Sequence, residues 1–64
     1  MNNKTFRVSK KGSSTFVDTN DINDAMKMAK EHSRAYREAH MVIYEIKNGR
    51  KYFVIGYHAG KAFR

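Results

Sequence analysis

The residues of this sequence best suited to chemistry are cations that gather around two predicted turns. Lys10 and Lys11 lie at the first turn, and Lys47, Arg50 and Lys51 flank the second. Such side chains bind phosphate oxygens, which supply much of the affinity in nucleic-acid complexes. Nearby rings can stack on unpaired bases, and they are Tyr44, Tyr52 and Tyr57. We therefore expect a nucleic-acid partner, DNA or RNA, bound at the two hairpin tips, which can lie near one another in a sheet of this kind. The alternative is that the tips are polar like most turns and that their lysines prevent sheet edges from pairing with other chains.

A further set of cations recurs at steps of three and four along a predicted helix: Lys27, Lys30, Arg34 and Arg37. This spacing aligns them on one ridge, where Arg34 and Arg37 could support phosphate binding. Alternatively, the ridge is an ordinary solvated face, because Glu31 and Glu38 are spaced to pair with Lys27 and Arg34.

The overall charge also favours a polyanionic partner. Thirteen Lys and Arg residues oppose six Asp and Glu residues, for a formal net charge of +7. All the acids fall between Asp18 and Glu45, which leaves both terminal regions purely cationic. Such a distribution suits nucleic acid, and it would also speed docking onto an acidic protein.

Other chemistries are poorly represented. The chain has three histidines, His32, His40 and His58, and no cysteine, so we expect no metal site. No nucleophile, base and orienting acid stand at a suggestive spacing, and the segment from Gly56 to Ala62 departs from the phosphate-binding loop. The sequence therefore predicts a non-enzymatic protein without a cofactor.

The segment from Met41 to Tyr57 organises the predicted fold. Two apolar runs flank Asn48 and Gly49, a pair that favours a tight two-residue hairpin turn. Residues 5–9 and 14–18 predict an N-terminal hairpin. A helix is expected from an N-cap at Asp21 to about Glu38. Its buried stripe would comprise Ile22, Ala25, Met26, Ala29, Ser33, Tyr36 and His40. We expect a single α+β domain over residues 1–64, in the order β-β-α-β-β, with one helix on one face of an antiparallel sheet and flexible ends at about 1–3 and 59–64.

One helix covers only one sheet face, yet both sides of the C-terminal hairpin are apolar. A two-residue turn would place Val42, Tyr44, Ile46, Phe53 and Ile55 on one side and Met41, Ile43, Tyr52 and Val54 on the other. A three-residue turn with a bulge would instead pair Glu45 with Lys51. In either register an apolar patch remains outside the core, which is typical of an interface. We expect a homodimer or a protein contact through Met41, Ile43, Tyr52, Val54 and Phe63.

The stretch Phe16–Ala29, FVDTNDINDAMKMA, resembles the strand and capped helix of many small α+β domains, some of which bind nucleic acid. A small basic chain of this kind also resembles products of phages and other mobile elements, many of which bind a host protein. This resemblance implies an alternative function, an inhibitor or regulator that binds a host protein through the uncovered apolar face. No membrane-spanning stretch or signal peptide is apparent, and a cytoplasmic location is expected.

Overall fold

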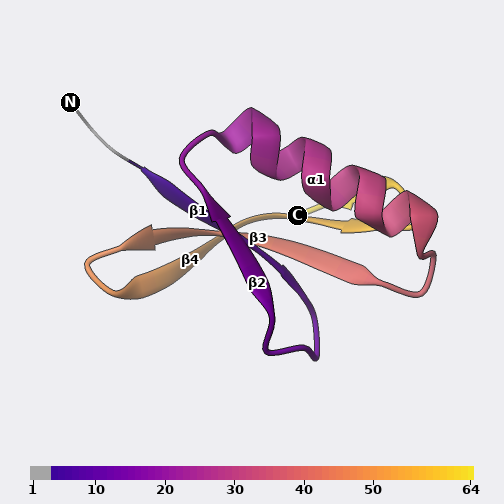
Figure 1. Ribbon diagram of the computed structural model, residues 1–64, viewed down its shortest axis with the longest axis horizontal. Coiled ribbons are helices and arrows are strands. Elements are labelled where there is room, and N and C mark those ends of the chain that lie inside the picture. The colour runs from indigo at the N-terminus through magenta and orange to yellow at the C-terminus, as the bar shows by residue number, and fades with distance from the viewer. Residues whose placement is uncertain (1–3) are drawn as a thin grey trace.

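The computed structural model describes residues 4–64, which form an antiparallel sheet of five strands with one helix across one face (Figure 1). The elements in chain order are β1 (Thr5–Lys10), β2 (Phe16–Thr19), α1 (Ile22–Ala35), β3 (His40–Lys47), β4 (Arg50–His58) and β5 (Lys61–Phe63). The strands lie in the order β2-β1-β3-β4-β5. The predicted α+β class is confirmed, with one strand more than the sequence predicts. In this part of the chain, no helix has the length and apolarity needed to cross a bilayer.

The helix begins where the sequence predicts. Asp21 has extended dihedrals, and its side-chain oxygen accepts a 2.8 Å hydrogen bond from the backbone N–H of Asn23. This bond satisfies one of the free amides of the first turn, and the carboxylate favours the positive end of the helix dipole. The helix ends at Ala35, short of the predicted Glu38. Tyr36 is therefore outside the helix and exposed rather than part of the buried stripe.

The core lies between α1 and one face of the sheet. Ala25 and Ala29 are fully buried, and their small side chains let the helix approach the strands closely. The sheet contributes Phe6, Val8, Met41, Ile43, Ile55 and Tyr57. Met41 and Ile43 were expected on the uncovered face, and that prediction is wrong: both are buried in this core, and Ile43 has no exposed surface.

A β-bulge in the C-terminal hairpin decides which residues of β4 share this helix-covered face with Met41 and Ile43. The two-residue turn is confirmed, since Lys47 faces Arg50 and the turn residues Asn48 and Gly49 both have positive φ. Tyr44 faces Phe53, but the register shifts between Ile43 and Tyr44, so that Ile43 faces Ile55. An extra residue on one strand reverses the alternation beyond it. Ile55 therefore packs on the helix side instead of joining Tyr44.

The C-terminal residues form a strand where the sequence predicts a flexible end at 59–64. Ala59 and Gly60 both have positive φ, and this second tight turn returns the chain as β5. The turn is attached to the helix, because the N–H of Gly60 donates a 3.0 Å hydrogen bond to Oγ of Ser33. The Ser33 hydroxyl, fully buried, in turn donates to the carbonyl of Lys30. The predicted flexibility of residues 1–3 lies outside the described residues.

Replacing Ser33 by Ala is expected to lower the free energy of unfolding by about 1–3 kcal/mol, because it leaves the Gly60 N–H without its partner. Urea denaturation followed by circular dichroism would measure this change. Ser14→Ala, at an exposed turn residue, is the matched control and should have little effect. Equal midpoints for the two variants would contradict the structural role given to the Ser33 hydroxyl.

Candidate nucleic-acid interface

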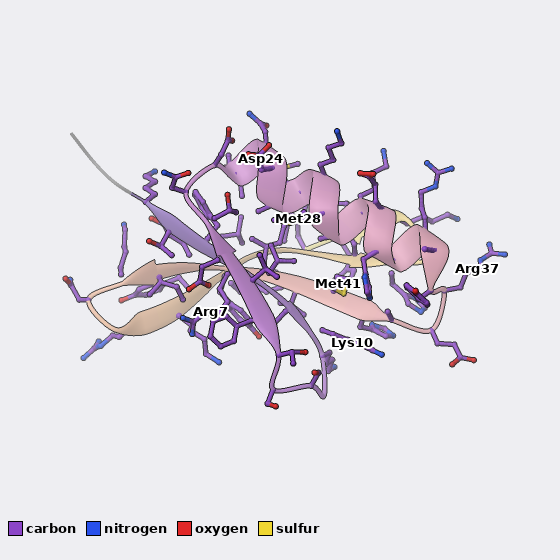
Figure 2. All side chains as sticks on the ribbon, in the orientation of Figure 1. Arg7, Lys10, Asp24, Met28, Arg37 and Met41 are labelled. Atoms are coloured by element: carbon purple, nitrogen blue, oxygen red, sulfur yellow. The ribbon has the colours of Figure 1, made fainter. Side chains whose placement is uncertain are left out.

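The face of the sheet away from α1 carries a mixture of rings and cations. Strand register places the following residues on it, and we call them the open sheet face: Arg7, Ser9, Phe16, Asp18, His40, Val42, Tyr44, Ile46, Lys51, Phe53, His58, Lys61 and Phe63. In Figure 2, Arg7 lies on this side, whereas Met28 and Met41 lie between the helix and the sheet. The exposed fractions of Phe16, Phe53 and Phe63 are 50%, 48% and 42%. Half-exposed rings of this kind are available to a partner.

The first cluster on the open sheet face joins β1 and β2. The guanidinium carbon of Arg7 lies 3.9 Å from the centroid of the Phe16 ring, a cation–π contact. The same guanidinium binds Asp18 through two bonds, Nε to Oδ1 at 2.9 Å and Nη2 to Oδ2 at 3.2 Å. These hydrogen bonds lower the pKa of Asp18 and raise that of Arg7. The ion pair holds Arg7 beside the ring.

The second cluster joins β3 and β4. The rings of Tyr44 and Phe53 meet edge to face, with centroids 6.4 Å apart. Nζ of Lys51 lies 5.0 Å from the centroid of the Tyr44 ring. A cation beside exposed rings can contact a phosphate while the rings contact its base.

The third cluster lies near the other end of β3, where β4 and β5 meet. The imidazoles of His40 and His58 stack with centroids 3.9 Å apart, and Phe63 stands edge-on to His40. The Phe63 ring occupies the space where a side chain at position 56 would lie, so a larger residue there would have to displace the ring. Gly56 thereby leaves room for the Phe63 ring to lie over the backbone of β4.

Two adjoining hollows connect these clusters. The larger has a volume of about 650 Å³ and the smaller about 250 Å³. Both are lined by Ser9, Ser13, Tyr44 and Lys51. Lys10 and Lys11 line the larger hollow as well. Three of the predicted nucleic-acid contacts, Lys10, Lys11 and Lys51, therefore line one depression. Lys10 faces Met41 across the strands, so it is on the helix side and lines the groove there as well.

The other predicted contacts are not brought to this depression. The expectation that the two hairpin tips lie near one another is wrong, because β1 runs antiparallel to β3, with Lys10 beside Met41 and Thr5 beside Ile46. Lys47 and Arg50 are therefore at the opposite end of the sheet from Lys10 and Lys11. Arg34 lies on the helix, with its side chain against Gly60, and Arg37 follows the helix end. Of the residues expected at a protein interface, Tyr52 and Phe63 are exposed and Val54 is partly buried.

Several residues of the open sheet face were not singled out from the sequence. Phe6 and Val8 alternate with polar residues in β1, and this alternation places Arg7 on the opposite side of the sheet from them. Phe16 lies on the open sheet face because the register of the N-terminal hairpin sets it opposite Ser9. The sequence left that register open, because the turn between the strands has no diagnostic residue pair.

The open sheet face is electropositive. Among residues 4–64 its one carboxylate is Asp18, which Arg7 neutralises. Glu45 points to the other side, where it pairs across the strands with Phe6 and Tyr52. Lys10, Lys11 and Lys51 line the depression, and no acidic residue in the described part of the chain does.

Replacing Arg7 by Gln is expected to raise the pKa of Asp18 back toward its ordinary value of about 3.9. The Arg7 hydrogen bonds lower the pKa of Asp18 in the folded protein. Their contribution to stability is therefore complete at pH values above the ordinary pKa of the unfolded chain, and it is lost as the pH falls through the lowered pKa of the folded protein. NMR titration of the Asp18 carboxyl carbon in both proteins measures the shift. An unchanged midpoint would show that the ion pair does not persist in solution.

The described residues contain no group of three or more histidine, cysteine, aspartate or glutamate side chains that could hold a metal ion. His40 and His58 lie ring on ring, which aligns their faces rather than their nitrogen atoms toward a common point.

Comparison with models of known protein families gives no match for this chain. Comparisons with curated proteins and with solved structures likewise give no match.

Proposed function

We propose that this protein binds single-stranded nucleic acid on the open sheet face and that it acts without catalysis. The observation that carries the proposal is the combination of three half-exposed phenylalanine rings with a lysine-lined depression on one sheet face. Base–aromatic stacking and phosphate contacts are the two interactions by which proteins hold unpaired strands.

Unpaired bases suit this surface better than a duplex. The rings of Phe16, Phe53 and Phe63 lie on different strands of a sheet, β2, β4 and β5. Stacking on such rings requires bases with free faces, which a duplex keeps inside its own stack. The lysines around the depression can follow the backbone of the same strand. This arrangement predicts tolerance of sequence, because every base offers a π face.

Charge on the helix serves as an internal comparison. Lys27 and Lys30 lie on α1, on the other side of the sheet from the depression. If phosphates bind on the open sheet face, Lys51 should contribute to the salt dependence and Lys27 should not.

Fluorescence anisotropy of labelled single-stranded DNA, single-stranded RNA and duplex DNA, at about 50 and 200 mM salt, tests the proposal. Three neutralised phosphates predict a slope of about −2 for log K against log salt on a single strand, and Lys51→Ala should reduce it by about 0.7. Lys27→Ala is the matched control and should leave the slope nearly unchanged. Equal, weak binding of all three nucleic acids that vanishes at the higher salt would overturn the proposal. The exposed rings would then favour the alternative, a protein partner on the same face.

A further inference from the structure

The two edges of the sheet differ in how they are protected from pairing with another strand. The β5 edge is short and carries Lys61, with Arg64 directly after it. Charged side chains and short strands are common means by which edges avoid pairing. The β2 edge, FVDT, carries no lysine or proline, and Arg7 neutralises its one charge, Asp18, from within the sheet. Of the two edge strands in residues 4–64, β2 is therefore the one open to another strand.

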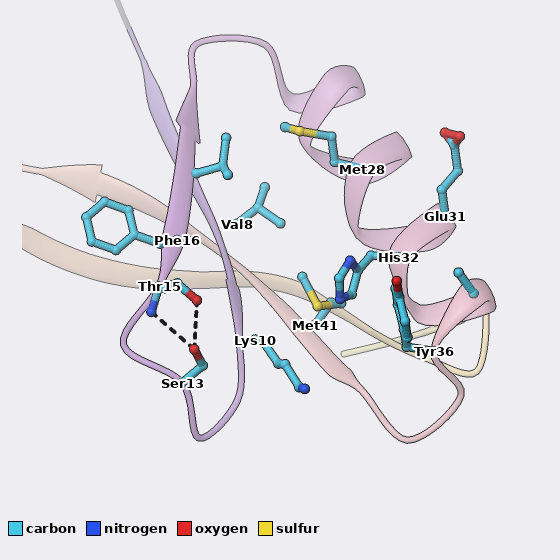
Figure 3. Close-up of a pocket in the computed structure, with 12 residues that line it drawn as sticks. Val8, Lys10, Ser13, Thr15, Phe16, Met28, Glu31, His32, Tyr36 and Met41 are labelled. Carbon is cyan, nitrogen blue, oxygen red and sulfur yellow. Dashed lines mark hydrogen bonds between the residues drawn. The ribbon is translucent and has the colours of Figure 1, made fainter.

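The helix also leaves much of the β2 edge uncovered. Val17 is on the helix side by its register with Val8, yet 54% of it is exposed. Between the helix and the β1–β2 hairpin runs a groove of about 870 Å³ (Figure 3). Met28 and His32 line it from the helix, Tyr36 lines it from just after the helix end, and Met41 lies between the two walls. Such a largely apolar surface beside an unprotected edge is typical of an interface.

We propose that the β2 edge and this groove form the contact between two copies of the chain. The charge near β2 does not oppose the binding of a second copy. The chain carries a net charge of +7, but the one charged side chain of β2, Asp18, is paired with Arg7, so two β2 strands can approach without strong repulsion. The groove is lined by one cation, Lys10, and one carboxylate, Glu31, so that two copies would not bring an excess of like charge together there. A chain of this length also gains from self-association, since a small core gives little stability.

Sheet geometry and charge limit the register of the pairing. If both helices stay on one side of a continuous antiparallel sheet, facing residues must point the same way. Val17 can then face the second copy's Val17, which sets Asp18 against Phe16. The next allowed register sets Asp18 against the second copy's Asp18, and like charges directly opposite are destabilising. The Val17 register is therefore preferred. The contact is small, so the dimer should be weak, with a Kd on the order of micromolar to millimolar.

Cross-linking through a single introduced cysteine tests this register, because the natural chain has no cysteine. In Val17→Cys the two facing Cα atoms would be about 4.5–5.5 Å apart, within the range that a disulfide spans. Mild oxidation should yield a covalent dimer that keeps the helical circular dichroism signal. Ala62→Cys, an exposed position on the β5 edge, is the matched control and should yield far less. Equal cross-linking of the two variants would overturn the proposal.

Sedimentation equilibrium tests the dimer without a cross-link. The natural protein should show reversible dimerisation as its concentration rises, and Val17→Lys should weaken the dimer at least tenfold by placing two cations opposite each other. Asn23→Lys adds the same charge on an exposed helix position and should leave the dimer unchanged. A natural protein that remains monomeric at about 1 mM, the weak end of measurable affinity, would contradict the proposal.

Discussion

Replacing Ile43 by Asp is expected to unfold the domain. Ile43 has no exposed surface and lies between Val8 and Ile55 in the core beneath the helix. An unpaired carboxylate there costs several kcal/mol, on top of the lost apolar contacts. Small domains have a total stability of only about 5 kcal/mol, so this single change removes most of it. Thermal unfolding followed by circular dichroism would show the loss of the helical signal at room temperature.

Ile46→Asp is the matched control for this prediction. Ile46 lies on the same strand but on the open sheet face, where it is only partly buried. The carboxylate can there reach water and lies opposite Lys51, so the variant should remain folded. An Ile43→Asp protein as stable as Ile46→Asp would show that the assignment of sheet faces is wrong.

Replacing Phe53 by Ala is expected to weaken binding of single-stranded nucleic acid while the fold is retained. The ring is 48% exposed and contacts Tyr44 edge to face, so its loss removes a stacking surface rather than part of the core. Stacking of one base on an aromatic side chain is worth about 1–3 kcal/mol, which corresponds to roughly 5- to 150-fold in Kd. Anisotropy titration of a labelled oligonucleotide measures the change.

Tyr36→Ala provides the comparison for Phe53. Tyr36 is 62% exposed, but it follows the helix and lines the groove on the other side of the sheet. Its loss should leave nucleic-acid affinity nearly unchanged. If the two variants lose affinity equally, the open sheet face is not where the bases stack.

Local signals in the sequence predicted the elements well. The cap at Asp21 and the turn at Asn48 and Gly49 depend on neighbouring backbone groups, so the residues themselves specify them. The bulge beside Tyr44 depends on tertiary packing, because it brings Ile55 and Tyr57 under the helix while Tyr44 and Phe53 remain on the open side. A pattern of apolar residues does not reveal such a shift. The assignment of Met41 and Ile43 to the uncovered face was wrong because the helix covers the side of β3 that these two residues share with Ile55 and Tyr57.

The candidate site was predicted in part. Lys10, Lys11 and Lys51 were identified from charge and now line one depression. Lys47 and Arg50 were grouped with them, although topology places them at the opposite end of the sheet. Which tips meet depends on the order of the strands, and residue types do not encode that order locally. The strand β5 was also missed, because its turn places a positive φ at Ala59, a residue that rarely adopts it.

The central claim, that unpaired nucleic acid binds on the open sheet face, is tested most directly by NMR titration of the protein with a short single-stranded oligonucleotide. Aromatic carbon and proton signals of Phe16, Tyr44, Phe53 and Phe63 should shift together as the strand is added, and the Lys51 side chain should follow. The Tyr36 ring and the Lys27 side chain provide reference signals on the other side of the sheet. Shifts confined to the open sheet face would support the claim, whereas shifts along Lys27, Lys30 and Arg34, or none at a saturating concentration, would contradict it.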